Sequence, residues 1–201
     1  MVKEEPKIML TSQEIRKAGK AARASLSKEE RGKKSKMIVA MLTESEWYRK
    51  AHTIMIYKAL GAEVSLSELE TVAAADGKIL LYPLCVSKTE MIALAPEGED
   101  AWVCGSYGIT EPVREKSKEY APEEIDLMVC PCTAFDEKCR RVGMGGGYYD
   151  RFLPKCENAH IVAVAFEAQK AESIPAEPWD QAMERVYTDT SVYENIGKMG
   201  K

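Results

Sequence analysis

Histidine is scarce in this sequence, which contains only two, His52 and His160. The six cysteines include Cys130 and Cys132, separated by one proline, and then Cys139. No histidine lies near these three, and their spacing fits no common zinc-binding pattern. We therefore expect reduced thiols in the core or in loops, as in cytoplasmic proteins, with thiolate metal binding as the less favoured alternative.

The sequence also lacks a basic excess and long apolar runs. Its net charge is −4, whereas a surface built for the nucleic-acid backbone needs a strong excess of cations; a local basic pocket is compatible with this balance. No window approaches the roughly 18 uncharged apolar residues of a membrane span, and Met1 to Lys7 lack the apolar centre of a signal peptide. We expect a cytoplasmic protein that binds neither nucleic acid nor membrane.

Length and composition are those of one soluble domain. The 201 residues are 45% hydrophobic and 30% charged, which is ordinary for a globular protein with a full core. No internal repeat, low-complexity tract or long linker divides the chain. We predict a single domain over residues 1–201, present as a monomer or a weak dimer.

Capping signals and apolar runs alternate along the chain. Helices are predicted from Thr11 or Ser12, from the Ser27 capping box to about residue 42, from Ser65 or Ser67 to about residue 77, and over 147–155. Strands are predicted over 53–57, 79–82 (ended by the proline at 83), 90–95, 125–130, 161–166 and 185–188, and mostly loop over 97–124. This order predicts an α/β fold: a three-layer α/β/α sandwich with a mostly parallel, Rossmann-like central sheet, whose ligand binds at the carboxyl ends of the strands.

The most distinctive segment has four glycines in five residues, Gly143, Gly145, Gly146 and Gly147, after a buried strand and before a helix. Backbone without side chains can bring several N–H groups onto one anion, which indicates phosphate binding. The segment is neither a Walker A loop nor a dinucleotide fingerprint. Its alternative reading is a flexible turn, but so many glycines are costly in backbone entropy, which favours a requirement for them.

A phosphate loop without its own lysine needs cations from elsewhere in the chain. Arg140 and Arg141 precede the glycines, and a guanidinium grips phosphate oxygens in pairs. We expect one of the two to face solvent and Arg141 to be functional. The first helix offers four more cations, for which a solvated helix face is the default expectation: Arg16, Lys17, Lys20 and Arg23.

Acidic and aromatic residues complete the set of candidates. Asp150 and Asp180 are candidate Mg²⁺ ligands, because Mg²⁺ on phosphates usually takes one or two carboxylates, although Asp150 also suits the first turn of a helix without further function. Asp136 is expected to brace its loop. Adjacent Tyr148 and Tyr149 should face different ways, and an aromatic in the glycine-flanked loop at 105–108 could stack on a flat ring.

These residues together resemble a known family. Pro131-x-x-Ala-Phe-Asp136 followed by Arg141-Val-Gly-x-Gly-x-Gly-Tyr-Tyr-Asp-Arg151 is similar to the signature of the 5-formyltetrahydrofolate cyclo-ligases, also called methenyltetrahydrofolate synthetases. Weaker blocks agree in order, including Leu26-Ser-x-Glu-Glu-Arg31, Glu63-Val64, Gly108-Ile-x-Glu-Pro112 and Pro175-x-Glu-Pro-Trp-Asp180. The likeness spans about residues 11–188.

The resemblance implies a reaction and assigns residues to it. Mg·ATP would phosphorylate the formyl oxygen of 5-formyltetrahydrofolate, and ring closure would give 5,10-methenyltetrahydrofolate, ADP and phosphate. Arg141 and Tyr149 are the implied catalytic residues, and Asp150 and Asp180 would hold Mg²⁺. The implied ATP-binding residues are Arg16, Arg141, Val142, Gly143, Met144, Gly145, Gly146, Gly147, Tyr148 and Tyr149; the implied folate-binding residues are Lys58, Glu63, Tyr107 and Glu111.

The sequence departs from the family pattern at a few positions. Cys132 and Cys139 stand where glycine is usual, and Ser12 where lysine is usual. Because a side chain resists a positive φ, we expect the turn at Cys139 to be reshaped. These changes keep two alternatives open: a non-catalytic module that binds folate or nucleotide, and a different enzyme on a similar sheet, such as a sugar-phosphate isomerase.

Overall fold

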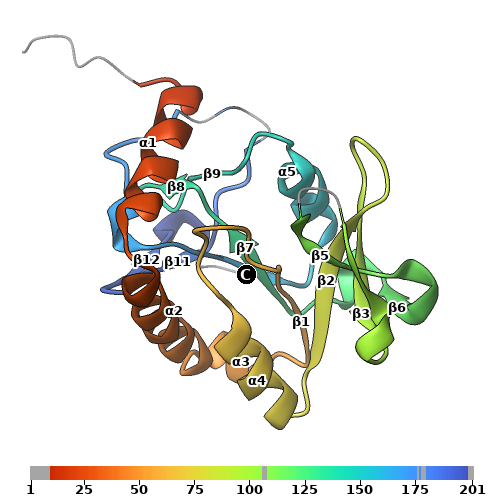
Figure 1. The fold of residues 1–201 in the computed structure, drawn as a ribbon. Helices are drawn as coiled ribbons and strands as arrows, with labels where there is room; N and C mark the ends of the chain where they lie inside the picture. Colours follow the sequence, from red (N-terminus) through yellow and green to blue (C-terminus); the bar gives the residue numbers. More distant parts are fainter. Residues whose placement is uncertain (1–9, 106–107, 176, 178–179, 199–201) are drawn as a thin grey trace, which may run out of the picture.

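A central sheet of eight strands organises the computed structural model, which describes residues 10–105, 108–175, 177 and 180–198 (Figure 1). The helices are α1 (Ser12–Ser25), α2 (Lys28–Thr43), α3 (Glu46–Lys50), α4 (Ser67–Ala75) and α5 (Tyr148–Phe152), with 3₁₀ turns η1 (Glu99–Ala101), η3 (Arg114–Lys116), η4 (Pro122–Glu124), η5 (Leu153–Lys155), η6 (Glu167–Gln169) and η7 (Ile196–Lys198). The strands are β1 (Thr53–Met55), β2 (Ile79–Cys85), β3 (Met91–Pro96), β4 (Trp102–Cys104), β5 (Thr110–Pro112), β6 (Ser117–Tyr120), β7 (Leu127–Pro131), β8 (Ala134–Phe135), β9 (Arg141–Val142), β10 (His160–Val164), β11 (Arg185–Tyr187) and β12 (Val192–Glu194).

The main sheet has the order β12-β11-β10-β7-β1-β2-β3-β6. Its centre, from β11 to β2, is parallel, and β12, β3 and β6 add antiparallel edges. In chain order the parallel strands run 2-1-3-4-5, so the direction of winding reverses between β1 and β7. Open α/β sheets bind ligands in the crevice at such a reversal.

Both faces of the sheet are covered, because alternate strand residues enter separate clusters. On β7, Leu127 and Val129 pack with α2, α3 and α4, whereas Met128 and Cys130 pack with Phe152 of α5 and with residues of the β8–β9 hairpin. The predicted three-layer α/β/α architecture is confirmed. In the described ranges, no helix combines the length and apolarity that a membrane crossing requires.

Two expectations about strands are wrong. Pro83 does not end β2, which continues to Cys85 opposite β3. The pairing of β2 with β1 stops at Leu81. On the side of β2 that faces β1, the missing N–H of Pro83 therefore costs no hydrogen bond. The segment 97–124 is not mostly loop, because it contains the short strands β4, β5 and β6 together with the 3₁₀ turns η1, η3 and η4.

The helix starts follow local capping. Ser27 forms the predicted capping box, and Thr11, one of the two predicted caps of the first helix, forms a capping box as well. The N-cap of α4 is Leu66, which has no side-chain bond, and not the expected serine. The Ser65 hydroxyl nevertheless accepts the Ser67 N–H at 3.4 Å and lies 3.1 Å from the Ser67 hydroxyl. Gly77 follows α4 with φ +69°, a conformation that glycine adopts without strain.

The turn at Cys139 keeps its left-handed conformation, contrary to expectation. Cys139 has φ +57° and is the only non-glycine residue with positive φ in the described part of the chain. Asp136 accepts the N–H groups of Lys138 and Arg140 at 3.0 and 3.1 Å, and its own N–H donates to the Arg140 carbonyl at 3.1 Å. Asp136 thus braces the β8–β9 turn, and these bonds hold cysteine in a shape that usually selects glycine.

Candidate active site

A cavity of about 1110 Å³ opens where β1 and β7 end. Its walls come from α1, from the loop after β1, from β2 and β5, and from the chain between β7 and α5. This is the reversal point of the parallel strands, as the fold predicts. Residues distant in sequence therefore meet around one space.

The described residues that the sequence assigns to the two substrates and to Mg²⁺ all line this cavity. Tyr107 is the exception, because it lies outside the described residues. The lining set comprises Arg16, Lys58, Glu63, Glu111, Arg141, Val142, Gly143, Met144, Gly145, Gly146, Gly147, Tyr148, Tyr149, Asp150 and Asp180.

The glycine segment forms an open loop over one side of the cavity. Gly145 and Gly147 have φ of +101° and +66°, which only glycine adopts readily. Within the described part of the chain, the N–H groups of residues 143–147 donate no hydrogen bond. These donors are therefore available to an anion in the cavity.

Arg141 and Arg140 lie in different environments. The Arg141 side chain is 3% exposed, and its Nη2 contacts Asp150 Oδ1 at 3.1 Å, while its guanidinium lies 5.4 Å from the centre of the Tyr149 ring. Its buried Nε has no hydrogen-bond partner among the described residues. Arg140 pairs instead with Asp136 and with the Ser173 hydroxyl, outside the cavity.

The expected solvated face of α1 is wrong for Arg16 and Arg23. Arg16 Nε donates to the Gly143 carbonyl at 2.8 Å, which ties α1 to the glycine loop. Arg23 is only 6% exposed and contacts Glu63. Lys17 does face solvent. The sequence offers Arg23 only as one of four cations on this helix, but its position seven residues after Arg16 puts both arginines on one helix face.

Glu63 and Lys58 lie on the other side of the cavity but do not contact each other in the structure. Glu63 Oε1 is 3.3 Å from Arg23 Nη1, and its Oε2 accepts the Leu60 N–H at 3.0 Å. The Lys58 ammonium bonds Glu70 at 2.6 Å and lies 4.9 and 4.6 Å from the ring centres of Tyr82 and Trp102, respectively. This side of the cavity thus presents a fixed carboxylate and a fixed cation.

The two adjacent tyrosines face different neighbours. The Tyr148 hydroxyl donates to the Ser87 carbonyl at 3.0 Å, which ties α5 to the β2–β3 turn. Burial raises the pKa of Tyr149 well above its ordinary value, so this phenol stays protonated and able to donate a hydrogen bond. Both line the cavity.

The candidate metal ligands also lie at this cavity. Asp150 contacts Arg141, and the exposed Asp180 accepts the Glu177 N–H at 2.9 Å through Oδ2. No group of three His, Cys, Asp or Glu side chains among the described residues is arranged to hold a metal. A site with one or two carboxylates suits Mg²⁺ bound together with phosphates.

Comparison with known proteins identifies the family of this chain. The sequence profile described as the 5-formyltetrahydrofolate cyclo-ligase family matches residues 9–189. The chain belongs to this family. The 5-formyltetrahydrofolate cyclo-ligase of Haemophilus influenzae is 30% identical over 136 residues, covering 66% of this chain and 73% of that protein. The Escherichia coli K12 cyclo-ligase is 29% identical over 150 residues, covering 72% and 81%.

Solved structures of family members share the fold. The 5,10-methenyltetrahydrofolate synthetase of Aquifex aeolicus superposes with a TM-score of 0.81 at 29% identity, over 92% of this chain and 93% of that one. The Mycoplasma pneumoniae synthetase has a TM-score of 0.75 at 22% identity, over 90% and 99%. The predicted family and fold are confirmed, and this cyclo-ligase family member builds its cavity on the expected sheet.

Proposed function

We propose that this protein converts 5-formyltetrahydrofolate to 5,10-methenyltetrahydrofolate with consumption of ATP and release of ADP and phosphate. The observation that carries the proposal is that one cavity of about 1110 Å³ is lined by the described candidate residues for both substrates. Membership of the cyclo-ligase family supports the same reaction.

The chemistry balances without a further reactant. The formyl oxygen attacks the γ-phosphorus of ATP and displaces ADP. N10 of the folate then attacks the formyl carbon and loses its proton, and the former formyl oxygen leaves within the phosphate. An oxygen that could not depart as oxide or hydroxide departs as phosphate, which is why the ring closure requires ATP.

The glycine loop and two arginines are suited to the phosphates. The N–H groups of residues 143–147 are free of partners within the described part of the chain, and the buried Nε of Arg141 is equally unpaired there. Arg16 carries a second guanidinium to the same loop through its bond to Gly143. Phosphoryl transfer depends mostly on positioning and on neutralising charge, and these donors supply both.

Asp150 and Asp180 would hold Mg²⁺ beside the phosphates. The ion would neutralise charge on the transferred group when bound. Asp150 already contacts Arg141 at 3.1 Å, so the carboxylate can orient the arginine as well. We expect Asp150→Asn to raise the Mg²⁺ concentration that gives half-maximal rate; an unchanged Mg²⁺ titration would remove Asp150 from the proposed ligands.

The folate would occupy the opposite side of the cavity. Glu63 presents a carboxylate, held by Arg23 and Leu60, that can accept N–H groups of the pterin. Tyr149, which keeps its proton, would face the formyl group, and Lys58 and Glu111 would complete the wall. Two of the departures from the family pattern, Ser12 and Cys132, also line this cavity.

A direct assay tests the proposal. Purified protein is given 5-formyltetrahydrofolate and Mg·ATP, and ADP release is followed together with the near-ultraviolet absorption of the methenyl product. We expect both signals in equal amounts and neither when ATP is omitted. Calorimetric binding of folate or nucleotide without turnover would instead indicate a binding module, and turnover of a sugar phosphate without nucleotide would indicate an isomerase.

We also propose that the protein works in the cytoplasm as a monomer or a weak dimer. All six cysteines are free thiols, four of them buried, which suits a reducing compartment. Cell fractionation tests the location, and light scattering over a range of concentrations tests the assembly state.

A further inference from the structure

One face of α1 lies against the cavity wall and carries Arg16, Gly19 and Arg23. The helix touches this wall through Gly19, where a Cβ would lie only 2.1 Å from the Thr133 carbonyl oxygen. Such contact between helix backbone and the segment after β7 leaves α1 little freedom to shift. The two arginines, on either side of this glycine, therefore reach the wall from a fixed base.

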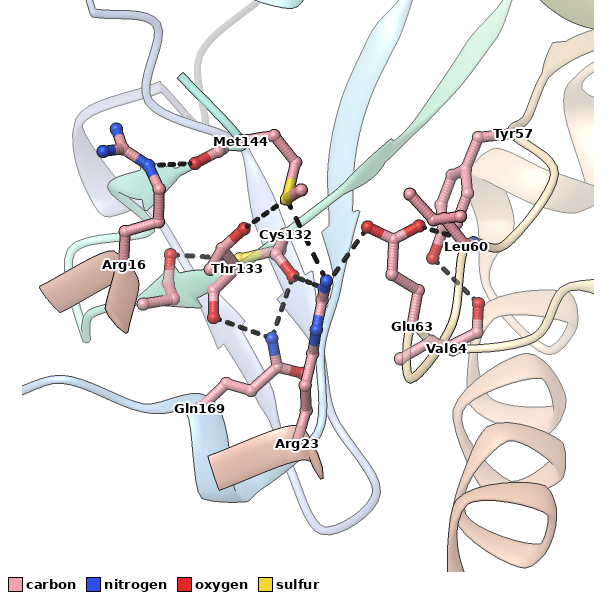
Figure 2. A network of polar contacts seen from close by, with 12 residues as sticks. Arg16, Arg23, Tyr57, Leu60, Glu63, Val64, Cys132, Thr133, Met144 and Gln169 are labelled. Atoms are coloured by element: carbon pink, nitrogen blue, oxygen red, sulfur yellow. Dashed lines mark hydrogen bonds and ion pairs between the residues drawn. The ribbon is translucent and has the colours of Figure 1, made fainter. Parts of the chain in front are cut away.

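Arg23 connects three segments that are far apart in sequence (Figure 2). Its Nη1 is 3.3 Å from Glu63 Oε1, in the loop after β1, and 3.4 Å from the Cys132 carbonyl, just after β7. Its Nη2 lies 4.0 Å from Met144 Sδ in the glycine loop. One guanidinium thus contacts the folate side of the cavity, the phosphate side and the wall between them.

The partners of Arg23 are themselves held in place. Gln169 Nε2 donates to the carbonyls of Cys132 and Thr133 at 2.9 and 2.8 Å. The Thr133 hydroxyl contacts Met144 Sδ at 3.7 Å. Figure 2 shows these groups gathered around the Arg23 guanidinium, with Glu63 on the far side. The Arg23 guanidinium is thus surrounded by partners that are themselves hydrogen-bonded, and it holds the Glu63 carboxylate together with the Leu60 N–H.

The ion pair between Arg23 and Glu63 is nearly dry, since the two side chains are 7% and 8% exposed. Buried pairs of this kind add little net stability, but removing one partner leaves an uncompensated charge. Arg23 itself does not line the cavity, whereas Glu63 and Met144 do. The Cys132 carbonyl, a third partner of Arg23, belongs to a residue that lines the cavity as well. Any effect of Arg23 on a ligand must therefore pass through these three neighbours.

We propose that Arg23 is a positioning residue that orients the Glu63 carboxylate toward the folate. Through Cys132 and Met144 it also sets the distance between that carboxylate and the glycine loop. The inference rests on the proposed cyclo-ligase function. On this proposal the two arginines of α1 have different roles. Arg16 acts on the glycine loop, on the phosphate side of the cavity, and Arg23 acts mainly on Glu63, on the folate side.

Three substitutions on α1 test this division. We expect Arg23→Met to raise the KM for 5-formyltetrahydrofolate about 10- to 100-fold and the KM for ATP by no more than about 3-fold. Arg16→Met should show the reverse pattern, a raised KM for ATP with little change for folate. Lys17→Met removes a solvent-exposed cation from the same helix and should change neither value.

Conservative and compensating variants separate positioning from a general loss of structure. Arg23→Lys keeps the charge but cannot bridge Glu63 and Cys132 as a guanidinium does, so we expect partial recovery of the folate KM. If Arg23→Met folds poorly, Arg23→Met combined with Glu63→Gln removes the unpaired charge and should restore the melting temperature without restoring folate affinity.

The outcomes are distinct for the two claims. An Arg23→Met protein with the wild-type KM for folate, or one in which both KM values rise equally, contradicts the positioning role. A wild-type protein that shows no turnover contradicts the proposed function instead. In that case calorimetry with 5-formyltetrahydrofolate still tests Arg23, because loss of folate binding in Arg23→Met but not in Lys17→Met is expected either way.

Discussion

Adjacent residues of one chemical type can have unrelated tasks, and Arg140 and Arg141 illustrate this at the scale of the residue. Arg140 neutralises the buried Asp136 that braces the β8–β9 turn. Arg141 lies in the cavity wall with an unpaired Nε. Strand geometry explains the difference, because neighbouring side chains of an extended segment point in opposite directions.

Replacing each arginine by alanine should separate these tasks. We expect Arg141→Ala to lower kcat/KM for ATP about 100- to 1,000-fold, the range seen when one donor to a developing charge is removed. Arg140→Ala should lower the free energy of unfolding, because Asp136 loses its cation, while kcat/KM for ATP in the folded protein stays near wild type. Steady-state kinetics and urea unfolding of both variants make the comparison; equal losses of activity would contradict it.

Gly145 combines a positive φ with a place in the proposed phosphate loop, so its two requirements can be tested apart. We expect Gly145→Val to prevent close approach of phosphate and to raise the KM for ATP at least tenfold. Gly77→Val is the matched control: Gly77 has φ +69° and no atom within 4 Å of an added Cβ. Both variants should lose stability through backbone strain of roughly 1–3 kcal/mol. A normal ATP KM in Gly145→Val would argue against the loop as the phosphate site.

At the scale of the element, one face of α1 supports the cavity wall, while the other face is exposed to solvent. Its capping box at Thr11 fixes where it starts, and Gly19 fixes how closely it approaches the segment after β7. Arg16 and Arg23 then reach the glycine loop and Glu63 from this base. Because a Cβ at Gly19 would meet the Thr133 backbone, a side chain there must displace either α1 or the segment that contains Thr133.

A methyl group at Gly19 tests whether the close packing of α1 against Thr133 positions the helix. The added Cβ would lie 2.1 Å from the Thr133 oxygen, so we expect Gly19→Ala to destabilise the fold by about 1–3 kcal/mol or more, as overpacked sites do, and to raise the KM for ATP by moving Arg16. Gly32→Ala, on α2 with nothing within 4 Å, should instead stabilise by about 0.5–1 kcal/mol through helix propensity. Gly19→Ala with unchanged stability and kinetics would contradict this account.

At the scale of the whole molecule, burial of weak acids limits stability at high pH. Burial raises the pKa of the Cys130 and Cys132 thiols to about 12, although the charge of Arg141 opposes the shift. Burial also raises the pKa of Tyr57 and Tyr149 well above their ordinary value. In an unfolded chain the pKa is about 8.5 for a cysteine thiol and about 10 for a tyrosine phenol. Their protonated forms therefore favour the folded state.

The sign of the pH effect follows from these shifts. Such a group has a higher pKa in the folded protein than in the unfolded chain. Its contribution to the free energy of unfolding is complete at a pH below the unfolded pKa and is lost as the pH rises toward the folded pKa. We expect the free energy of unfolding, measured in urea, to fall from about pH 8.5 upward by at most about 1.4 kcal/mol per pH unit for each group. Cys130→Ala should flatten this slope, whereas substitution of the exposed Cys104 should not. A constant free energy up to pH 11 would contradict the prediction.

Much of the architecture is readable from local pattern. Apolar runs without alternation indicate strands covered on both faces, and the run 125–130 became β7 with both faces buried. The glycine segment and Arg141 were identifiable because dense glycine after a strand has few explanations besides close approach of a ligand. The position of the cavity followed from the same pattern, since the carboxyl ends of parallel strands share one edge.

Short strands and strands at the edge of a sheet cannot be predicted from local pattern in this way. The strands β4, β5 and β6 are three or four residues long within a Gly- and Pro-rich segment, so their local signals are weak. Pro83 ends a strand only when its N–H is needed on the ladder, and that depends on which neighbour lies beside β2. Pairing partners decide both cases, and they are distant in sequence.

The sequence by itself determined the family, the alternation of the longer helices with the parallel strands, and the place of the glycine loop after β7, because each depends on residues that are close together along the chain. Only the tertiary structure decided that Arg23 meets Glu63, forty positions away, and that Cys139 keeps a left-handed turn. The physical reason is the same in both cases. Burial and hydrogen bonds from other segments outweigh the local preference of an arginine for water and of a cysteine for negative φ.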